Sequence, residues 1–350
     1  MATLTETAHH TRKIVKYGII ALTGLFLLKT AISSAASYWH KLNPPPPPPP
    51  TVAFGKLPKI EFPESKFKEK ELVYRLETID GGTPNLGDRT KVYFMPTKKP
   101  SLMALDRAES QARKLGFSGP AKKISERLYR WQKEDPLLAS LEMDIINNNF
   151  AIKKNWQDDQ SLLKGERLPI KEQAVIEAKN FLKTSGLLTE DLQAGETKTS
   201  LLRFIPPNLV PAISLSEADF VRVNIFRKNL NNLPILPPYL EEASVSLLLS
   251  GSRDREKRVV ELKYINFPIA EETSATYPLK TSAQAWEELK RGEGFIANLK
   301  ENRKQIIIRK IYLAYFENSL PQNYLQPIYV FEENNDFAAY VPAISPEWTE

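Results

Sequence analysis

The sequence contains no cysteine and only three histidines, His9, His10 and His40, all of which precede residue 51. The missing cysteines exclude disulfides, thiol catalysis, iron–sulfur clusters and zinc–thiolate sites. Because residues 51–350 have neither His nor Cys, they cannot assemble a Ser–His–Asp or Cys–His catalytic set. The folded part of the chain must therefore be stabilised by packing.

Net charge is scarce beyond the N-terminal region. The formal charge is +6, and residues 1–50 hold five Lys or Arg against one Glu. The other 300 residues carry 43 basic and 41 acidic side chains. This balance lacks the basic footprint of a protein that binds a phosphate backbone, so we expect no nucleic-acid partner.

The composition that remains suits a chain that folds mostly in water. Hydrophobic residues make up 42% and charged residues 26%, which is the balance of a globular protein. A chain of 350 residues is long enough for two domains, or for one domain built of repeated units.

One long apolar run lies between Ile14 and Trp39. Its 26 residues, at about 1.5 Å of rise each, exceed the roughly 30 Å hydrocarbon core of a bilayer. We therefore predict a transmembrane signal-anchor helix over residues 14–39. Lys29 lies near its middle and is expected to snorkel toward the headgroups, since a charge at the midplane is costly. The alternative is that Lys29 marks a contact with a partner.

The flanks of this run predict its orientation. Arg12, Lys13 and Lys16 precede it, and Tyr38 and Trp39 close it like an interfacial aromatic belt. We expect residues 1–13 to form a cytoplasmic tail and the C-terminal domain to be extracytoplasmic, in a single-pass protein of the cell membrane. The alternative is a signal peptide cleaved near residues 34–36, which would release a secreted binding protein.

Seven consecutive prolines, Pro44–Pro50, follow the apolar run. They favour extended polyproline II structure, which rises about 3.1 Å per residue and would span roughly 20 Å. We interpret them as a stiff spacer; the alternative is a ligand for an aromatic-lined groove. Residues 40–70 as a whole are assigned to a proline-rich spacer and linker, in which residues 51–70 become ordered only gradually.

Three short amphipathic helices are predicted in the remaining chain. Each has apolar residues at helical spacing, and a glycine follows each of them. Their expected ranges are Ser101–Leu115, Ile170–Ser185 and Ser282–Arg291. The third begins with a capping-box spacing and is expected to bury Trp286 and Leu289.

Runs with strand character follow each helix. They are Lys123–Trp131, Leu138–Ile146, Phe150–Trp156, Leu201–Ile205, Phe220–Arg227, Val245–Ser250, Arg258–Phe267, Ile306–Phe316, Ile328–Glu332 and Phe337–Val341. We predict an α+β protein in which the N-terminal transmembrane helix is followed by repeated helix-plus-antiparallel-sheet modules at 71–165, 166–270 and 271–350. Similar strand, Asn-rich turn and Phe-Ala sequences at 145–151 and 331–338 favour an internal duplication.

The C-terminal stretch carries a family resemblance. Its sequences YPLKTSAQAWEELKRGEGF, IIIRKIYLAYFE and LQPIYVFEENNDFAAYVPAI resemble those of membrane-anchored accessory regulators of the YycH and YycI type and of PepSY-like modules. The resemblance covers about the last 75 residues, with a fainter version at 101–156. It implies a helix-on-sheet module outside the membrane that regulates a sensor kinase or a protease by contact. It carries over no functional residue.

Patterns that carry catalysis in other proteins are weak in this chain. Ser65-x-x-Lys68 and Ser161-x-x-Lys164 have the spacing of a Ser–Lys dyad, but a chain this rich in Ser and Lys produces such matches by chance. Asp158 and Asp159 are expected to be solvated loop acids. We therefore expect no catalytic, cofactor-binding or metal-binding residues, and no cofactor.

Two polar segments, at residues 80–82 and 250–258, are predicted to be loops. Asp80-Gly81-Gly82 lacks the ending of a phosphate-binding loop and is predicted to be a turn. Residues 250–258 carry four basic and two acidic side chains and read as a charged hairpin tip. It is expected to be solvated, the alternative being contact with an acidic partner or lipid headgroups.

These observations predict a membrane-anchored, extracytoplasmic protein that is not an enzyme and acts by protein–protein contact in a regulatory or scaffold role. Its membrane attachment is the N-terminal helix, and its protein partner is not identified by the sequence. The alternatives are an exported carboxylate-type hydrolase and the secreted binding protein already described.

Overall fold

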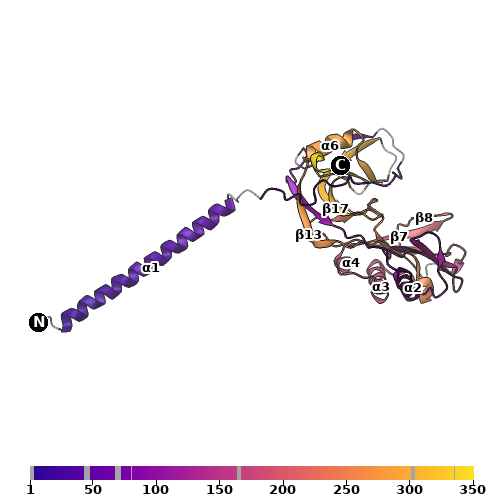
Figure 1. The fold of residues 1–350 in the computed structure, drawn as a ribbon, viewed down its shortest axis with the longest axis horizontal. Coiled ribbons are helices and arrows are strands. Elements are labelled where there is room, and N and C mark those ends of the chain that lie inside the picture. Colours follow the sequence, from indigo (N-terminus) through magenta and orange to yellow (C-terminus); the bar gives the residue numbers. More distant parts are fainter. Residues whose placement is uncertain are drawn as a thin grey trace. The chain divides into compact units, whose positions relative to one another are not determined.

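The computed structural model describes residues 4–42, 48–67, 72–79, 81–163, 167–300, 304–334 and 336–350. The chain divides into two compact units, Met1–Pro49 and Pro50–Glu350 (Figure 1).

The first unit is a single helix, α1 (Leu4–Leu42). Within it, Val15–Trp39 is long and apolar enough, by length and composition, to cross a membrane. None of that segment is buried within the described part of the chain. The predicted apolar helix is confirmed, while Pro44–Pro47 of the spacer lie outside the described residues.

The second unit is α+β, as predicted, and its larger part is a nine-stranded sheet in which every neighbouring pair is antiparallel. In spatial order the strands are β3 (Lys122–Lys123), β4 (Leu128–Lys133), β5 (Ala139–Asp144), β6 (Phe150–Lys154), β12 (Val259–Tyr264), β11 (Val245–Ser250), β9 (Phe220–Ile225), β7 (Thr197–Ile205) and β8 (Asn208–Pro211). Alternation builds the inner face, as in β5, where Ala139, Leu141 and Met143 are buried and the residues between them are not.

Helices cover one face of this sheet. They are α2 (Ala104–Lys114), α3 (Lys171–Thr184) and α4 (Glu190–Ala194), and Figure 1 shows them side by side. Stripes of small residues, such as Ala104, Ala108 and Ala112 in α2, let the helices approach the strands closely, and they share one buried core with them. The first two predicted helices are confirmed, and the glycine after α2, Gly116, has a left-handed φ of 84°.

The smaller part of the unit is built on a seven-stranded sheet with a short parallel pair beside it. The sheet runs β10 (Ile235–Leu236), β16 (Lys310–Phe316), β17 (Tyr324–Glu333), β18 (Phe337–Pro342) and β14 (Phe295–Leu299), and β2 (Arg89–Phe94) joins β17 to β13 (Ala270–Pro278). The parallel pair is β1 (Val73–Leu76) with β15 (Gln305–Ile308). The predicted strand at 306–316 is therefore broken at Arg309 and shared between two sheets.

Helix α6 (Ser282–Lys290) packs on this smaller part, close to the predicted range. Its predicted capping box is present, with Thr281 and Gln284 bonding each other's backbone N–H groups. Leu289 is buried, whereas Trp286 is only half-buried and packs against Tyr74 and Phe331.

Replacing Trp286 by alanine should therefore cost about 2–3 kcal/mol, below the range for a fully buried tryptophan, because part of the ring already faces solvent. Urea unfolding of residues 50–350 measures the change. Glu287→Ala, on the exposed side of the same helix, is the matched control and should change stability little. Equal losses in both variants would contradict a packing role for the indole ring.

The sheets join segments that the sequence placed in different modules. β6, from residues 71–165, pairs with β12, from residues 166–270, and β2 pairs with β13 and β17. The two similar Asn-rich sequences do form hairpin turns, and each has one asparagine in the left-handed region, Asn148 and Asn334. Asparagine tolerates that backbone conformation better than most residues do, which explains why both turns use it.

Residues 50–67 differ from the expected gradual linker, because they pack on the smaller part of the unit as an extended segment, here called the strap. Leu57 is completely buried and bridges Thr349 in parallel. Phe62 stacks on Phe295 at 5.0 Å between ring centroids. In the sequence the apolar residues of this segment are scattered among Pro, Lys and Glu. In the structure they fill the edge of a core.

Candidate functional site

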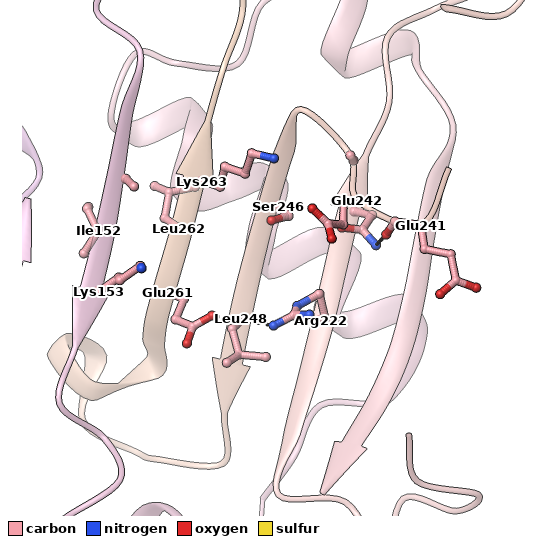
Figure 2. Close-up of a pocket in the computed structure, with 13 residues that line it drawn as sticks. Ile152, Lys153, Arg222, Glu241, Glu242, Ser246, Leu248, Glu261, Leu262 and Lys263 are labelled. Atoms are coloured by element: carbon pink, nitrogen blue, oxygen red, sulfur yellow. Dashed lines mark hydrogen bonds and ion pairs between the residues drawn. The ribbon is translucent and has the colours of Figure 1, made fainter. Parts of the chain in front are cut away.

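The face of the nine-stranded sheet opposite the helices, here called the open face, presents polar side chains in its centre. Strand pairing aligns Lys153, Glu261, Leu248 and Arg222 in one row across β6, β12, β11 and β9. Figure 2 shows this row with the helices behind the sheet. An antiparallel sheet commonly packs one face on a core and leaves the other to solvent, which is where these charged residues lie.

A groove of about 250 Å³ crosses the open face. Its lining comes from four strands and from the loop before β11, and we call it the open-face groove. The lining residues are Ala151, Ile152, Lys153, Arg222, Asn224, Glu241, Glu242, Ala243, Ser246, Leu248, Glu261, Leu262 and Lys263.

The acidic side chains of the groove are already paired. Glu261 accepts a hydrogen bond from Trp156 Nε1 at 3.2 Å and lies 3.6 Å from the guanidinium of Arg222. Glu242 pairs with Lys66 of the strap at 2.5 Å, and Glu241 pairs with Lys300 at 3.0 Å. Each carboxylate of the groove thus already has a cationic partner.

Two other polar groups of the groove, the Asn224 amide oxygen and the Lys263 amine, have no partner within the described part of the chain. Asn224 is 7% exposed and donates to the Glu241 carbonyl at 3.0 Å, but its Oδ1 atom has no partner there. The half-buried amine of Lys263 likewise forms no hydrogen bond or ion pair with described residues, whereas Lys153 is exposed to solvent. A buried acceptor without a partner is costly, so this arrangement favours a ligand that supplies a donor.

Burial lowers the pKa of Lys263, and nearby Lys66 lowers it further, while Glu242 opposes them. Figure 2 shows the Lys263 amine and the Glu242 carboxylate extending toward Ser246 from opposite sides. A ligand carbonyl or carboxylate that accepted a hydrogen bond from Lys263 would replace the solvation that burial removes.

The groove thus offers a donor at Lys263 of β12 and an acceptor at Asn224 of β9, the two strands that flank β11. A peptide amide has the complementary groups, a carbonyl and an N–H. The volume is slightly below the usual range for small-molecule sites, about 300–1,000 Å³, and suits one side chain or a short stretch of backbone.

The structure separates the two acids singled out from sequence. Asp158 is exposed and accepts from Asn155 Nδ2 at 2.6 Å. Asp159 caps the short helix η1 (Gln160–Leu162) and pairs with Lys257 at 2.7 Å. The hydrogen bond from Lys257, followed by that from Ser161, holds the pKa of Asp159 below its ordinary value. Asp159 is thus a paired structural residue, which corrects its expected role as a solvated acid.

The remaining sequence candidates also have local partners. Ser161 Oγ donates to Asp159 at 2.6 Å, and Ser65 Oγ donates to the Phe67 carbonyl at 3.0 Å. Lys68, Lys164 and Asp80, to which the other predictions refer, lie outside the described residues. Gly81 N donates to the Thr78 carbonyl, as in a turn. Within the described ranges, no group of three or more His, Asp or Glu side chains is arranged to hold a metal ion.

A second polar cluster, which sequence reasoning missed, joins the two large sheets. Arg227, after β9, donates to Asp191 of α4 and to Glu317 after β16, both at 2.6 Å, and to the Phe267 carbonyl at 2.7 Å. The side chains of Arg227 and Glu317 are 9% and 3% exposed. Burial raises the pKa of Asp191, but the charge of Arg227 and hydrogen bonds to the carboxylate outweigh it and lower that pKa.

Neither cluster could be recognised as a site from the sequence. The only signal for the groove was charge at alternate positions of buried strands, as in Glu261 and Lys263 between Val260, Leu262 and Tyr264. Which of these charges share a face depends on pairing between strands about 100 residues apart, such as β6 and β12.

Comparison with known proteins adds little to this geometry. No protein-family model and no curated protein matches the sequence. Among solved structures, the chain is similar to an uncharacterized protein from Eubacterium rectale, with a TM-score of 0.33 and 11% identity over 79% of this chain and 88% of that chain. A likeness at this level carries no argument about fold or function.

Proposed function

We propose that this is a single-pass membrane protein whose extracytoplasmic domain acts by contact with another protein and not as an enzyme. The apolar helix at Val15–Trp39 is compatible with the anchor. The basic residues before it and the aromatic pair at its end support a cytoplasmic N-terminus. The resemblance of the C-terminal sequences to YycH- and YycI-type regulators supports such a role.

The open-face groove is the observation that carries this proposal. Its acids are paired, whereas Lys263 and Asn224 present an unused donor and an unused acceptor. A protein segment laid across the sheet would satisfy both groups and bury the polar row. A hydrolase of carboxylate type would instead need two free acids that converge on one substrate.

Site-specific crosslinking tests the proposal in intact membranes. A photoreactive benzoylphenylalanine in place of Lys153, at the exposed edge of the groove, should yield a discrete crosslinked protein identifiable by mass spectrometry. Lys263→Met should reduce that product by about tenfold, because it removes the unused donor while keeping most of the side-chain volume.

The matched control places the same photoreactive residue at Arg107, which is exposed on α2, on the other face of the sheet. An identical product from both positions, or none from Lys153, would contradict a partner at the groove.

Protease added to spheroplasts tests the orientation in the membrane. It should digest the domain and leave a short N-terminal fragment, whereas protection of the C-terminus would reverse the topology. A mature mass short of residues 1–36 would assign the protein to the secreted class.

A further inference from the structure

The loop between β11 and β12 is tied to the body of the domain on three sides. Lys257 pairs with Asp159 at 2.7 Å, and Arg258 binds Glu177 of α3 through two hydrogen bonds of 2.8 and 2.9 Å. Glu256 accepts from Lys133 at 2.6 Å. The loop is therefore held in place and differs from the freely solvated tip expected from sequence.

Both acids of the loop, Asp254 and Glu256, are engaged in local contacts, whereas two of its arginines are not. Asp254 caps the short helix α5 (Arg255–Arg258) through the Glu256 N–H at 2.9 Å. Arg253 and Arg255 are exposed, and their guanidinium groups pair with no described residue. The guanidinium of Arg167, across the pocket, is in the same condition, although its carbonyl accepts from Arg258.

The three unpaired arginines surround a pocket of about 830 Å³, here called the arginine pocket. It lies on the helix-covered face of the sheet, where α3 passes the ends of β11 and β12. Half-buried Phe181 of α3 gives it apolar surface between the charges, over the buried core residues Leu249 and Val259. Glu177 of the lining is paired with Arg258.

We propose that the arginine pocket binds an acidic segment of a partner protein, in which carboxylates flank one apolar side chain. Guanidinium groups match carboxylates in shape and can bind them through two parallel hydrogen bonds. The acid in the lining, Glu177, is already paired with Arg258, and the exposed part of Phe181 between the arginines can receive an aliphatic or aromatic side chain. The positive charge of the pocket therefore favours a partner segment with negative charge.

A polypeptide fits these features better than a bilayer surface does. A protein that docks on headgroups presents basic residues over a broad face, whereas this pocket gathers three arginines around one aromatic side chain, Phe181. The residues after the spacer carry a net charge of only +2. This proposal concerns the opposite face of the sheet from the open-face groove, so either site can fail its test while the other passes.

The test uses full-length protein in detergent micelles and a fluorescein-labelled probe peptide, Gly-Asp-Glu-Phe-Asp-Glu-Gly. Its binding, measured by fluorescence anisotropy, should be at least about tenfold tighter than that of the matched peptide with Asn and Gln in place of the acids. The difference should shrink as salt rises from low to physiological concentration, because the arginines are partly exposed. Equal affinity of the two peptides would overturn the proposal.

Charge reversal locates the binding. The double variant Arg253→Glu, Arg255→Glu should weaken the acidic peptide by at least about tenfold. The matched control is Arg203→Glu, an exposed arginine of β7 outside the pocket, which should leave the affinity within about twofold. Equal loss in both would show general attraction and refute the pocket. Binding of sn-glycerol 1-phosphate that is tighter than that of the peptide would assign the pocket to lipid headgroups and also refute it.

Discussion

Replacing Arg227 by methionine is expected to destabilise the unit formed by residues 50–350 by about 3–5 kcal/mol, the usual cost of breaking a buried ion pair from one side. Arg227 neutralises Asp191 and Glu317 at once, and both carboxylates would remain in the interior after the substitution. The loss should also loosen the joint between the two sheets, since the cluster links α4, β9 and the end of β16. Urea unfolding at neutral pH measures the change.

Arg222→Met provides a matched control for this prediction. Arg222 also forms an ion pair, with Glu261, but the distance between the charged groups is 3.6 Å and the two side chains are 35% and 34% exposed. Such a pair should contribute less than about 1 kcal/mol. If the two variants lost equal stability, the argument from burial would fail. Adding Asp191→Asn and Glu317→Gln to Arg227→Met should recover part of the loss, because the buried charges are then removed.

The pH dependence gives a second signature of the Arg227 cluster. In the wild-type protein the pKa of Asp191 lies below its unfolded value of 3.8, so its stabilising contribution is present above that pH and is lost as the pH falls through the folded pKa. Without Arg227, burial dominates and raises the pKa of Asp191, so the carboxylate destabilises the variant at neutral pH and becomes tolerable once protonated. The difference between wild type and variant should therefore shrink below about pH 4.

The sequence predicted well those elements that depend on local patterns. Alanine spacing and the following glycine marked α2 and α3, and the Thr281 to Gln284 spacing marked the start of α6. Each of these signals lies within one or two helical turns. The N-terminal helix and the α+β class were predictable for the same reason, since each depends on composition along a continuous stretch.

The parts that failed depend on contacts between distant segments. The Arg227 cluster joins residues at 191, 227 and 317, and the groove depends on the register of β6 against β12. A one-residue shift in that register would move Lys153 to the opposite face relative to Glu261, so no local pattern specifies the groove. The prediction of a freely solvated loop at 250–258 was wrong for the same reason. The partners of this loop, Asp159, Glu177 and Lys133, lie in three other parts of the chain.

The strap was misjudged because its backbone bonds are not those of a regular strand. Leu57 N donates to the Trp348 carbonyl at 2.9 Å, and the Leu57 carbonyl accepts from Glu350 N at 2.9 Å. Gln326 donates to the Pro58 carbonyl at 2.8 Å, and Val52 N donates to Thr276 at 3.0 Å. Pro, Lys and Glu at the intervening positions resemble a linker in composition, although they simply occupy the exposed side of a packed segment.

The strap leads to the second large prediction: a chain that begins at Pro50 should fold, whereas one that begins at Glu64 should lose at least about 5 kcal/mol or fail to fold. The longer deletion removes Leu57 and two aromatic residues, Phe54 and Phe62, each of which contributes about 1.5–3 kcal/mol when buried. Leu57→Ala in the chain that begins at Pro50 should alone cost about 2–5 kcal/mol, because Leu57 is completely buried. Lys56→Ala, at the neighbouring exposed position, should change little. Urea unfolding compares the four chains, and equal midpoints for the two starting points would show that the strap is a linker after all. A loss confined to the shorter chain and to Leu57→Ala would instead place the start of the folded domain at the last proline, with the spacer ending where the core begins.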